Sequence, residues 1–226
     1  MPTSRCNPFA VAMFSLLGIL MLASPASADI IYSNTGAFIQ DDDTVLINFS
    51  LAVDSLVTLQ TWSFAGGTNA NSQVIAPGGF APVLSLFQGT GPSATLLLSD
   101  SGGTAPNGCG PRGIDVSTTG FCLDAYLNGT LSAGDYIAVL TEYDNTPNGT
   151  TLGDGFFQDG QGNFTGGPFW LNAGTGFQRD SSWAVDITST PTAPFAPVPE
   201  PSVIVLLASL SLFAFVFRYR WRKSGA

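Results

Sequence analysis

The sequence predicts an all-β protein: an antiparallel β-sandwich or jelly-roll-like domain between two processing segments. Three observations indicate this fold class. Short runs alternate apolar with polar residues, the segments between them are rich in Gly, Asn, Ser and Thr, and no long helical periodicity occurs between Asp29 and about Thr190. Many short strands separated by turn residues are typical of sandwiches and jelly rolls.

The run over 44–51 shows the strand pattern most clearly. Val45, Ile47, Phe49 and Leu51 would face one way, with polar residues between them. Because successive side chains point to opposite faces of a strand, this run predicts a half-buried strand. Similar runs predict strands over 56–64, 82–87, 94–98, 121–127, 135–143 and 182–188, with turns at 65–71, 89–93 and 128–129.

The first 28 residues have the three parts of a secretory signal peptide. Arg5 supplies the positive start, 9–23 is apolar, and Ala26-Ser27-Ala28 forms a small-residue cleavage pattern. Asp29 would then be the mature N-terminus. The alternative is an uncleaved membrane helix, but the apolar run is short for a span and a proline follows it.

The C-terminal end combines a proline motif, an apolar run and basic residues. Pro199-Glu200-Pro201 precedes an apolar run over 203–217, and four basic residues lie between Arg218 and Lys223. A helix of that length spans about 22 Å, short of a hydrocarbon core of about 30 Å, so a thin-membrane span is expected. The basic residues place the C-terminus in the cytoplasm. Residues 191–198 form a proline-rich linker to this tail anchor.

This order of three parts resembles the PEP-CTERM sorting signal over about the last 28 residues, with Pro199, Glu200 and Pro201 as the motif. The resemblance implies recognition by an exosortase, an integral-membrane enzyme of Gram-negative bacteria that typically make exopolysaccharide. It therefore implies an inner-membrane intermediate, followed by release to the cell surface or the extracellular matrix. The alternative is a plain membrane anchor with a proline-rich stalk.

The runs over 80–87, 123–126 and 131–139 resemble a second family, the bacterial pre-peptidase C-terminal domain. This resemblance implies a compact β-sandwich without catalysis of its own. Ala81 stands where that family has an aspartate before the strand, which puts any shared calcium site in doubt. The stretch over 160–183 resembles a variant that is common in PEP-CTERM proteins and whose role is uncharacterised.

Composition argues against several function classes. Between Asp29 and Asp186 the chain carries 15 acidic residues, Arg112, Arg179 and no lysine, a net charge of −13. Such a surface would repel nucleic acid, whose phosphates need clustered basic residues. The chain has no histidine, which removes the usual general base of nucleophilic catalysis. We therefore expect no enzyme, although a hydrolase with a pair of carboxylates stays open.

Cys109 and Cys122 are the two cysteines that remain after signal-peptide removal. An even pair in an oxidising compartment predicts a disulfide. Closing a loop of this size would stabilise the fold by about 3 kcal/mol in the chain-entropy description. The alternative is a reactive thiol, but no histidine or lysine lies nearby to lower its pKa.

Two acidic clusters, Asp41-Asp42-Asp43 and the loop over 154–163, could bind calcium, which prefers oxygen ligands on a turning backbone. Asp154, Asp159 and Asn163 are the candidate ligands. The alternative is a solvated acidic loop that keeps the protein soluble.

Aromatic residues are frequent late in the domain and could stack on sugars. Phe169 and Trp170 form the best candidate platform for a glycan, and buried packing is the alternative. Trp183 alternates with Val185 and Ile187, which predicts a place in the core.

These observations predict an exported, non-enzymatic surface or matrix protein that acts in adhesion, matrix structure or glycan binding. Expected partners are exosortase, the inner membrane and exopolysaccharide, with no cofactor except a structural calcium. A membrane-anchored periplasmic binding module and a secreted carboxylate-pair hydrolase are the two alternatives.

Overall fold

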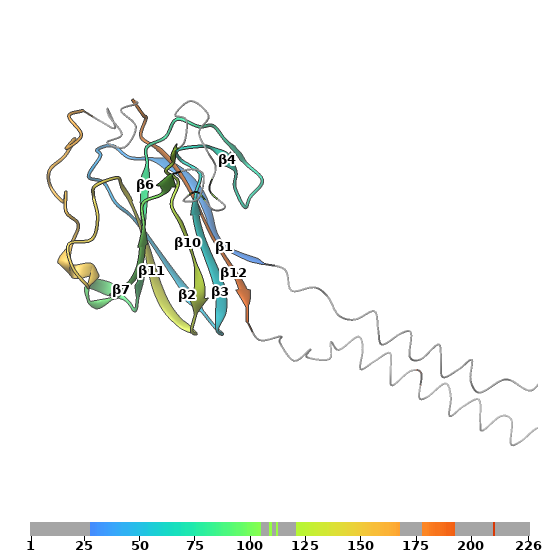
Figure 1. Cartoon of the computed structure of the whole chain (residues 1–226). Coiled ribbons are helices and arrows are strands. Elements are labelled where there is room, and N and C mark those ends of the chain that lie inside the picture. The colour runs from blue at the N-terminus through green and yellow to red at the C-terminus, as the bar shows by residue number, and fades with distance from the viewer. Residues whose placement is uncertain are drawn as a thin grey trace, which may run out of the picture. The chain divides into compact units, whose positions relative to one another are not determined.

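The computed structural model describes residues 28–104, 109, 112, 121–167, 178–192 and 210. Its main feature is a pair of four-stranded antiparallel sheets (Figure 1). The first sheet has the order β1 (Asp29–Ala37), β12 (Ser182–Pro191), β3 (Ser55–Thr61) and β10 (Tyr126–Leu131). The second has the order β2 (Val45–Leu51), β11 (Gly134–Glu142), β6 (Pro82–Gln88) and β7 (Thr95–Asp100).

Short elements complete the described fold. Two small hairpins pair β4 (Gly67–Thr68) with β5 (Val74–Ile75) and β8 (Gly103–Thr104) with β9 (Phe121–Cys122). Two 3₁₀ turns, η1 (Gly91–Ser93) and η2 (Leu152–Asp154), lie beside each other.

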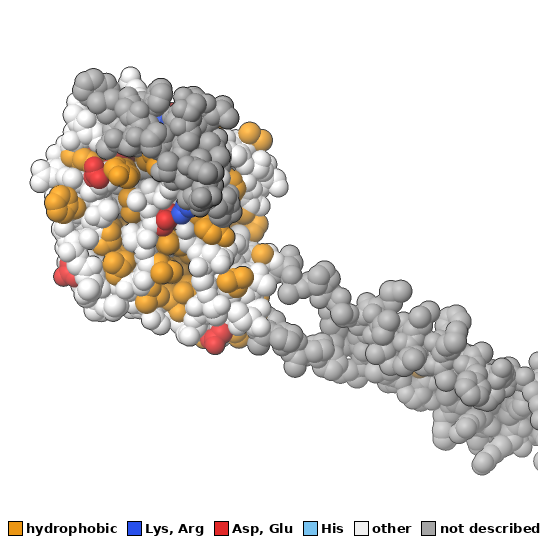
Figure 2. Space-filling model, in the orientation of Figure 1, with side chains coloured by type: hydrophobic (Ala, Val, Ile, Leu, Met, Phe, Trp, Pro, Cys, Tyr) orange, Lys and Arg blue, Asp and Glu red, His pale blue; other side chains and the backbone are white. Residues whose placement is uncertain are grey.

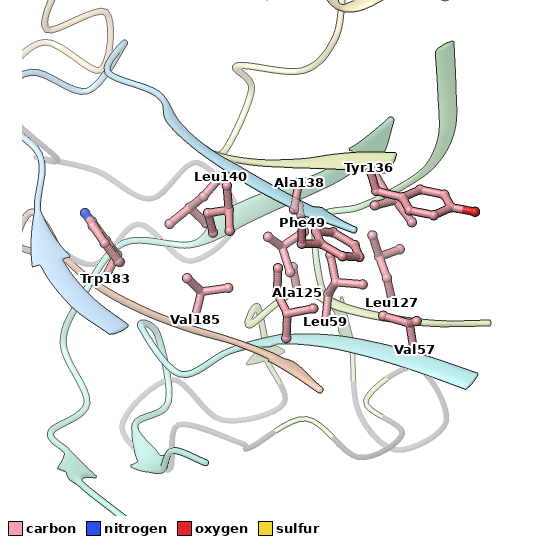
Figure 3. Close-up of a cluster of buried hydrophobic side chains, with 14 of the residues drawn as sticks. Phe49, Val57, Leu59, Ala125, Leu127, Tyr136, Ala138, Leu140, Trp183 and Val185 are labelled. Atoms are coloured by element: carbon pink, nitrogen blue, oxygen red, sulfur yellow. The ribbon is translucent and has the colours of Figure 1, made fainter. Parts of the chain in front are cut away.

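The main hydrophobic core lies between the two sheets (Figure 3). It takes alternate residues from both: Ile47, Phe49, Leu51, Leu84, Leu86, Tyr136, Ala138 and Leu140 from the second sheet, and Val57, Leu59, Leu127, Leu131, Trp183, Val185 and Ile187 from the first. The predicted inward faces of the 44–51 strand and of Trp183 are thereby confirmed. The rings of Phe49 and Tyr136 stack at 5.5 Å, and the Tyr136 hydroxyl donates to the Ser132 carbonyl at 2.8 Å. The architecture is a β-sandwich.

A second apolar cluster covers the outer face of the second sheet. Ile137 and Val139 point away from the main core and pack with Phe87, Ala94 and Phe156. The segment after β11 thus covers this face, and β11 is buried on both sides. This explains why β11 is apolar almost throughout, where a half-exposed strand would alternate.

The predicted strand over 121–127 and the predicted turn at 128–129 are wrong. The strand is split into β9 and β10, and Asn128 and Gly129 lie inside β10, paired with Thr58 and Val57 of β3. Asp124 causes the break, because its carboxylate accepts the backbone N–H groups of Phe64 and Ala65. Pairing with β3 overrides the local preference of Asn-Gly for a turn. The first strand, β1, was not predicted.

The two ends of the sandwich sequence lie side by side. Asp29, the first residue of β1, pairs with Ser189 of β12, and β12 continues to Pro191, the first residue of the predicted linker. The amide N–H of Thr192 donates to the Asp54 carbonyl at 3.0 Å. The chain divides into two compact units after Thr192. The first and the last described strands of the sandwich sequence therefore begin and end at the same end of the sheet.

Candidate functional site

The acidic triplet Asp41-Asp42-Asp43 lies in the turn between β1 and β2, at the end of the sandwich opposite Thr192. Asp43 closes the turn itself: its Oδ2 accepts the N–H groups of Ile39 at 2.6 Å and Gln40 at 2.9 Å. Asp41 is fully buried. The triplet is thus a structured turn, from which the carboxylates of Asp41 and Asp42 reach a neighbouring loop.

That neighbouring loop is the second acidic cluster of the sequence. Asp41 accepts the N–H of Phe164 on Oδ1 at 2.8 Å, and the N–H of Thr165 on Oδ2 at 2.9 Å, together with the Thr165 hydroxyl. Asp42 accepts the N–H of Gly162 at 3.0 Å. The two clusters therefore form one assembly, in which carboxylates hold a backbone. We call Asp41, Asp42 and residues 162–165 the carboxylate clasp.

Asn145, in the turn that follows β11, reinforces the clasp. It is fully buried. Its Oδ1 accepts the N–H of Gln158 at 2.8 Å, and its Nδ2 donates to the Asp42 carbonyl at 3.4 Å. One side chain thereby connects the triplet, the end of β11 and the 158–165 loop. Because amide side chains both donate and accept, Asn can make this link where an ionised carboxylate could not.

Glu142 ends β11 beside this assembly and is the most unusual group of the site. Its side chain is only 2% exposed, and its Oε2 has no hydrogen-bond partner among the described residues. Burial, together with the smaller effect of the negative charges of Asp41 and Asp144, raises the pKa of Glu142 to about 9. The carboxyl group is therefore neutral at pH 7 and carries a proton that it can donate.

Asp124 forms a second buried acid site. Its carboxylate accepts the Thr61 hydroxyl at 2.9 Å and the N–H groups of Phe64 at 3.0 Å and Ala65 at 2.8 Å. Burial raises the pKa of Asp124 to about 6, although these hydrogen bonds oppose the shift. The Arg179 guanidinium lies 3.7 Å from the centroid of the Phe64 ring, a cation–π contact. Asp124 and Arg179 thus both fix the segment around Phe64.

The three predicted calcium ligands each stabilise a local turn. Asp154 Oδ2 accepts the Thr151 N–H at 2.8 Å and hydroxyl at 2.9 Å, which lowers the pKa of Asp154. Asp159 accepts the Phe156 N–H at 2.7 Å, and the Asn163 carbonyl accepts the N–H of Gly166. Among the described residues, no three acidic or cysteine side chains are placed to hold a metal ion. Structural calcium stays a prediction, and equal melting temperatures with calcium and with excess chelator would contradict it.

The predicted disulfide between Cys109 and Cys122 is confirmed, with 5.4 Å between the Cα atoms. Arg112, inside the loop that it closes, makes an ion pair with Asp100 of β7 at 2.7 Å. The same Asp100 oxygen accepts the N–H of Tyr126 at 2.8 Å. The loop is therefore fixed to the sandwich by a covalent bond and by a charge pair.

Several predicted features lie outside the described residues. These are residues 1–27 of the predicted signal peptide over 1–28, the glycan platform of Phe169 and Trp170, the sorting motif Pro199-Glu200-Pro201 and all of the 203–217 span except Leu210. Within the described ranges, no helix has the length and apolar character that a bilayer crossing needs.

Sequence reasoning missed Glu142, Asp124 and Asn145. A signal existed for Glu142, the only glutamate before Glu200. It continues the alternation of Tyr136, Ala138 and Leu140, so the pattern alone would turn it inward.

Comparison with known proteins identifies a known motif in one part of the chain. Residues 197–223 match the PEP-CTERM protein-sorting motif. This match confirms the tail as a PEP-CTERM signal, which indicates an exported protein that an exosortase sorts at the membrane. No curated protein matches the chain.

Proposed function

We propose that this chain is a non-enzymatic protein that exosortase-dependent sorting delivers to the cell surface or the extracellular matrix. There the β-sandwich serves adhesion, matrix structure or glycan binding. The observation that carries the proposal is the PEP-CTERM motif over 197–223, only a few residues after a folded sandwich whose last strand ends at Pro191. A compact cargo followed by a separate sorting segment is the organisation that such delivery needs.

The state of the buried acids favours binding or structure over hydrolysis. A glycosidase needs two carboxyl groups that reach opposite sides of a sugar bond. Asp41 and Asp124 have their oxygens occupied by backbone and hydroxyl donors. Glu142 has the raised pKa of a general acid but is only 2% exposed. These carboxyl groups therefore suit structural roles better than attack on a polymer.

The surface suits an uncharged partner. Figure 2 shows one face on which acidic side chains stand singly among polar and hydrophobic atoms. Carbohydrates present hydroxyl groups together with apolar ring faces, and such a mixed surface can meet both. The proposal is also supported by the resemblance of the sandwich to the pre-peptidase C-terminal domain, which is non-catalytic. It includes a host that makes exopolysaccharide.

The sorting part is tested by expressing the full chain in a bacterium that has an exosortase. We expect a released form that begins at Asp29 and lacks the C-terminal tail, as intact mass measures. The variant Pro199→Ala/Glu200→Ala/Pro201→Ala should stay in the membrane fraction with its tail. The matched control is Pro194→Ala, in the linker before the matched segment, which should be released.

Each outcome decides between the alternatives. Persistent membrane fractionation of the unaltered chain with its tail would favour the periplasmic binding module, and recovery from the cytosol with both ends intact would overturn export. Binding of the released form to the host's exopolysaccharide tests the glycan role, with Trp170→Ala as the platform variant. Cleavage of that polysaccharide would favour the hydrolase.

A further inference from the structure

Three polar side chains form a row on the outer face of the first sheet. Ser33 of β1 lies directly opposite Asp186 of β12, and Asp186 lies directly opposite Gln60 of β3. Directly opposite residues of antiparallel strands share a face, with about 4.5–5.5 Å between their Cβ atoms. The neighbours Val185 and Ile187 point into the core, so this row points outward. We call Ser33, Asp186 and Gln60 the polar row.

Each residue of the polar row has a buried polar atom without a partner. Ser33 Oγ, Asp186 Oδ1 and Gln60 Nε2 make no hydrogen bond within the described structure. Asp186 as a whole is only 5% exposed. A buried polar atom without a partner has lost its hydrogen bonds to water and gained none in return, so native proteins seldom tolerate three together. A buried water or ligand oxygen is the usual partner of such atoms when they do not bond one another directly.

The segment that covers the polar row is fixed in place by its other atoms. Asp186 Oδ2 accepts the indole N–H of Trp62 at 2.7 Å and the N–H of Ala70 at 2.7 Å. Asn71 Nδ2 donates to the Ser33 carbonyl at 3.0 Å. The cover includes the turn of the β4–β5 hairpin, because Ala70 and Asn71 lie between these two strands. Asp186 Oδ1 is left without a partner beneath it.

The three unpaired atoms differ in whether they donate or accept, and this limits which chemical group can hydrogen-bond to all of them. Asp186 Oδ1 only accepts, Gln60 Nε2 only donates, and the Ser33 hydroxyl does both. An anion would be repelled by the carboxylate, and a cation would face the amide N–H₂ group. A neutral hydroxyl oxygen both donates and accepts, and a buried oxygen of this kind makes about three hydrogen bonds.

We propose that the polar row is a binding site for one hydroxyl oxygen. The oxygen donates to Asp186 Oδ1, accepts from Gln60 Nε2 and exchanges a hydrogen bond with Ser33 Oγ. Water can supply it beneath the closed cover. A carbohydrate hydroxyl can supply it when the β4–β5 hairpin moves aside, and this second source rests on the proposed glycan-binding role.

A crystal structure of the mature released protein tests the site, alone and with cellopentaose as the probe. In the free protein we expect an oxygen within hydrogen-bond distance of at least two of the three atoms. A cellopentaose hydroxyl in that position would assign the carbohydrate source, and an unchanged water would assign the water source. Direct bonds among the three side chains, or three atoms still unpaired, would overturn the proposal. The test uses the released form but is decided only by the atoms at the polar row, so failure here leaves the delivery proposal intact.

Variants give a second, independent readout. Ser33→Ala and Gln60→Leu should each lower the melting temperature by about 2–4 °C, the shift expected for about 1 kcal/mol in a domain of this size. If both side chains hold the same oxygen, the double variant should lose clearly less than the sum of the two shifts. The control is Thr58→Ala, whose hydroxyl bonds directly to Asn128 Nδ2 at 2.7 Å. Thr58→Ala should add fully to Ser33→Ala, and full additivity of Ser33→Ala with Gln60→Leu would refute the shared oxygen.

Discussion

Gly36 of the edge strand β1 lies directly opposite Trp183 of β12, and the indole ring covers the glycine. A Cβ atom at position 36 would overlap the Trp183 ring, at 2.7 Å from Cε2 and closer still to Cζ2. The glycine thus gives the indole its place at the end of the core. An aromatic ring over a glycine on the neighbouring strand is a recognised way to stabilise such an edge.

The first prediction concerns this pair. Gly36→Ala should lower the free energy of unfolding by about 1–3 kcal/mol, because the added methyl group forces the indole to shift. Gly129→Ala is the matched control, since a Cβ there would meet only Leu98 Cδ1 at 4.0 Å. Urea unfolding of both variants measures the difference, and equal midpoints would contradict the packing described.

The second prediction is a pH dependence of stability set by Glu142. Its pKa is raised from 4.5 to about 9 in the folded protein. Below about pH 4.5 both the folded and the unfolded forms hold the proton, so Glu142 does not lower the free energy of unfolding there. As the pH rises from 4.5 to 9 the unfolded chain releases the proton and the folded chain retains it, so stability falls. Asp124, raised from 3.8 to about 6, adds a smaller fall over the lower part of this range.

Melting temperatures between pH 5 and pH 9 test the Glu142 contribution. Glu142→Gln keeps a neutral side chain of the same shape, so its curve should be flatter than that of the unaltered protein, most clearly above pH 6. Asp154→Asn, at an exposed turn, serves as the control and should keep the original slope. Parallel curves for the unaltered protein and Glu142→Gln would show that Glu142 does not set the slope.

The third prediction concerns the carboxylate clasp. Asp41→Ala removes the acceptor for two backbone N–H groups and the Thr165 hydroxyl, and should cost about 3 kcal/mol of stability. Asp29→Ala, an exposed acid at the start of β1, should change stability by less than about 0.5 kcal/mol. Amide hydrogen exchange gives a local readout: the Phe164 and Thr165 amides should lose protection in Asp41→Ala. Retained protection at both amides would mean that another group holds the loop.

The fourth prediction concerns the disulfide. Cys109→Ser/Cys122→Ser should lower stability by about 3 kcal/mol, the chain-entropy value for a loop of this size. A reductant should lower the melting temperature of the unaltered protein to that of the double variant, and should leave the variant unchanged. If full reduction, checked by mass, leaves the melting temperature in place, the ion pair of Arg112 with Asp100 would be sufficient to hold the loop.

Periodicity predicted the long strands of the sandwich well, because alternation records which face is buried. The strands over 44–51, 82–87 and 135–143 correspond to β2, β6 and β11. The same rule could not find β1. Its residues are mostly half-buried or exposed at a sheet edge, so it alternates weakly, and pairing with β12 defines it. The split at Asp124 depends on donors some 60 residues away, at Phe64 and Ala65, which a local window does not contain.

The candidate site shows the same contrast between local patterns and contacts with distant residues. The sequence identified both acidic clusters as unusual, but their structural role depends on how the fold brings them together. Asp41 reaches residues more than 120 positions later, and this contact makes it a structural acceptor. Asp154 and Asp159 looked like metal ligands because calcium sites and acidic turns use the same residues. The disulfide, in contrast, was predictable from cysteine count and compartment alone.

The position of β12 inside its sheet has a mechanical consequence. The strand that leads to the sorting segment pairs with β1 on one side and β3 on the other along most of its length. A pull on the chain at Thr192 acts along the axis of β12, so the hydrogen bonds of two ladders bear the force together in shear. An edge strand pulled in the same direction would have only one ladder to resist the force. A force applied through the C-terminal tail would therefore be resisted by both ladders of β12 together, which keeps the sandwich folded while the chain is attached to the membrane.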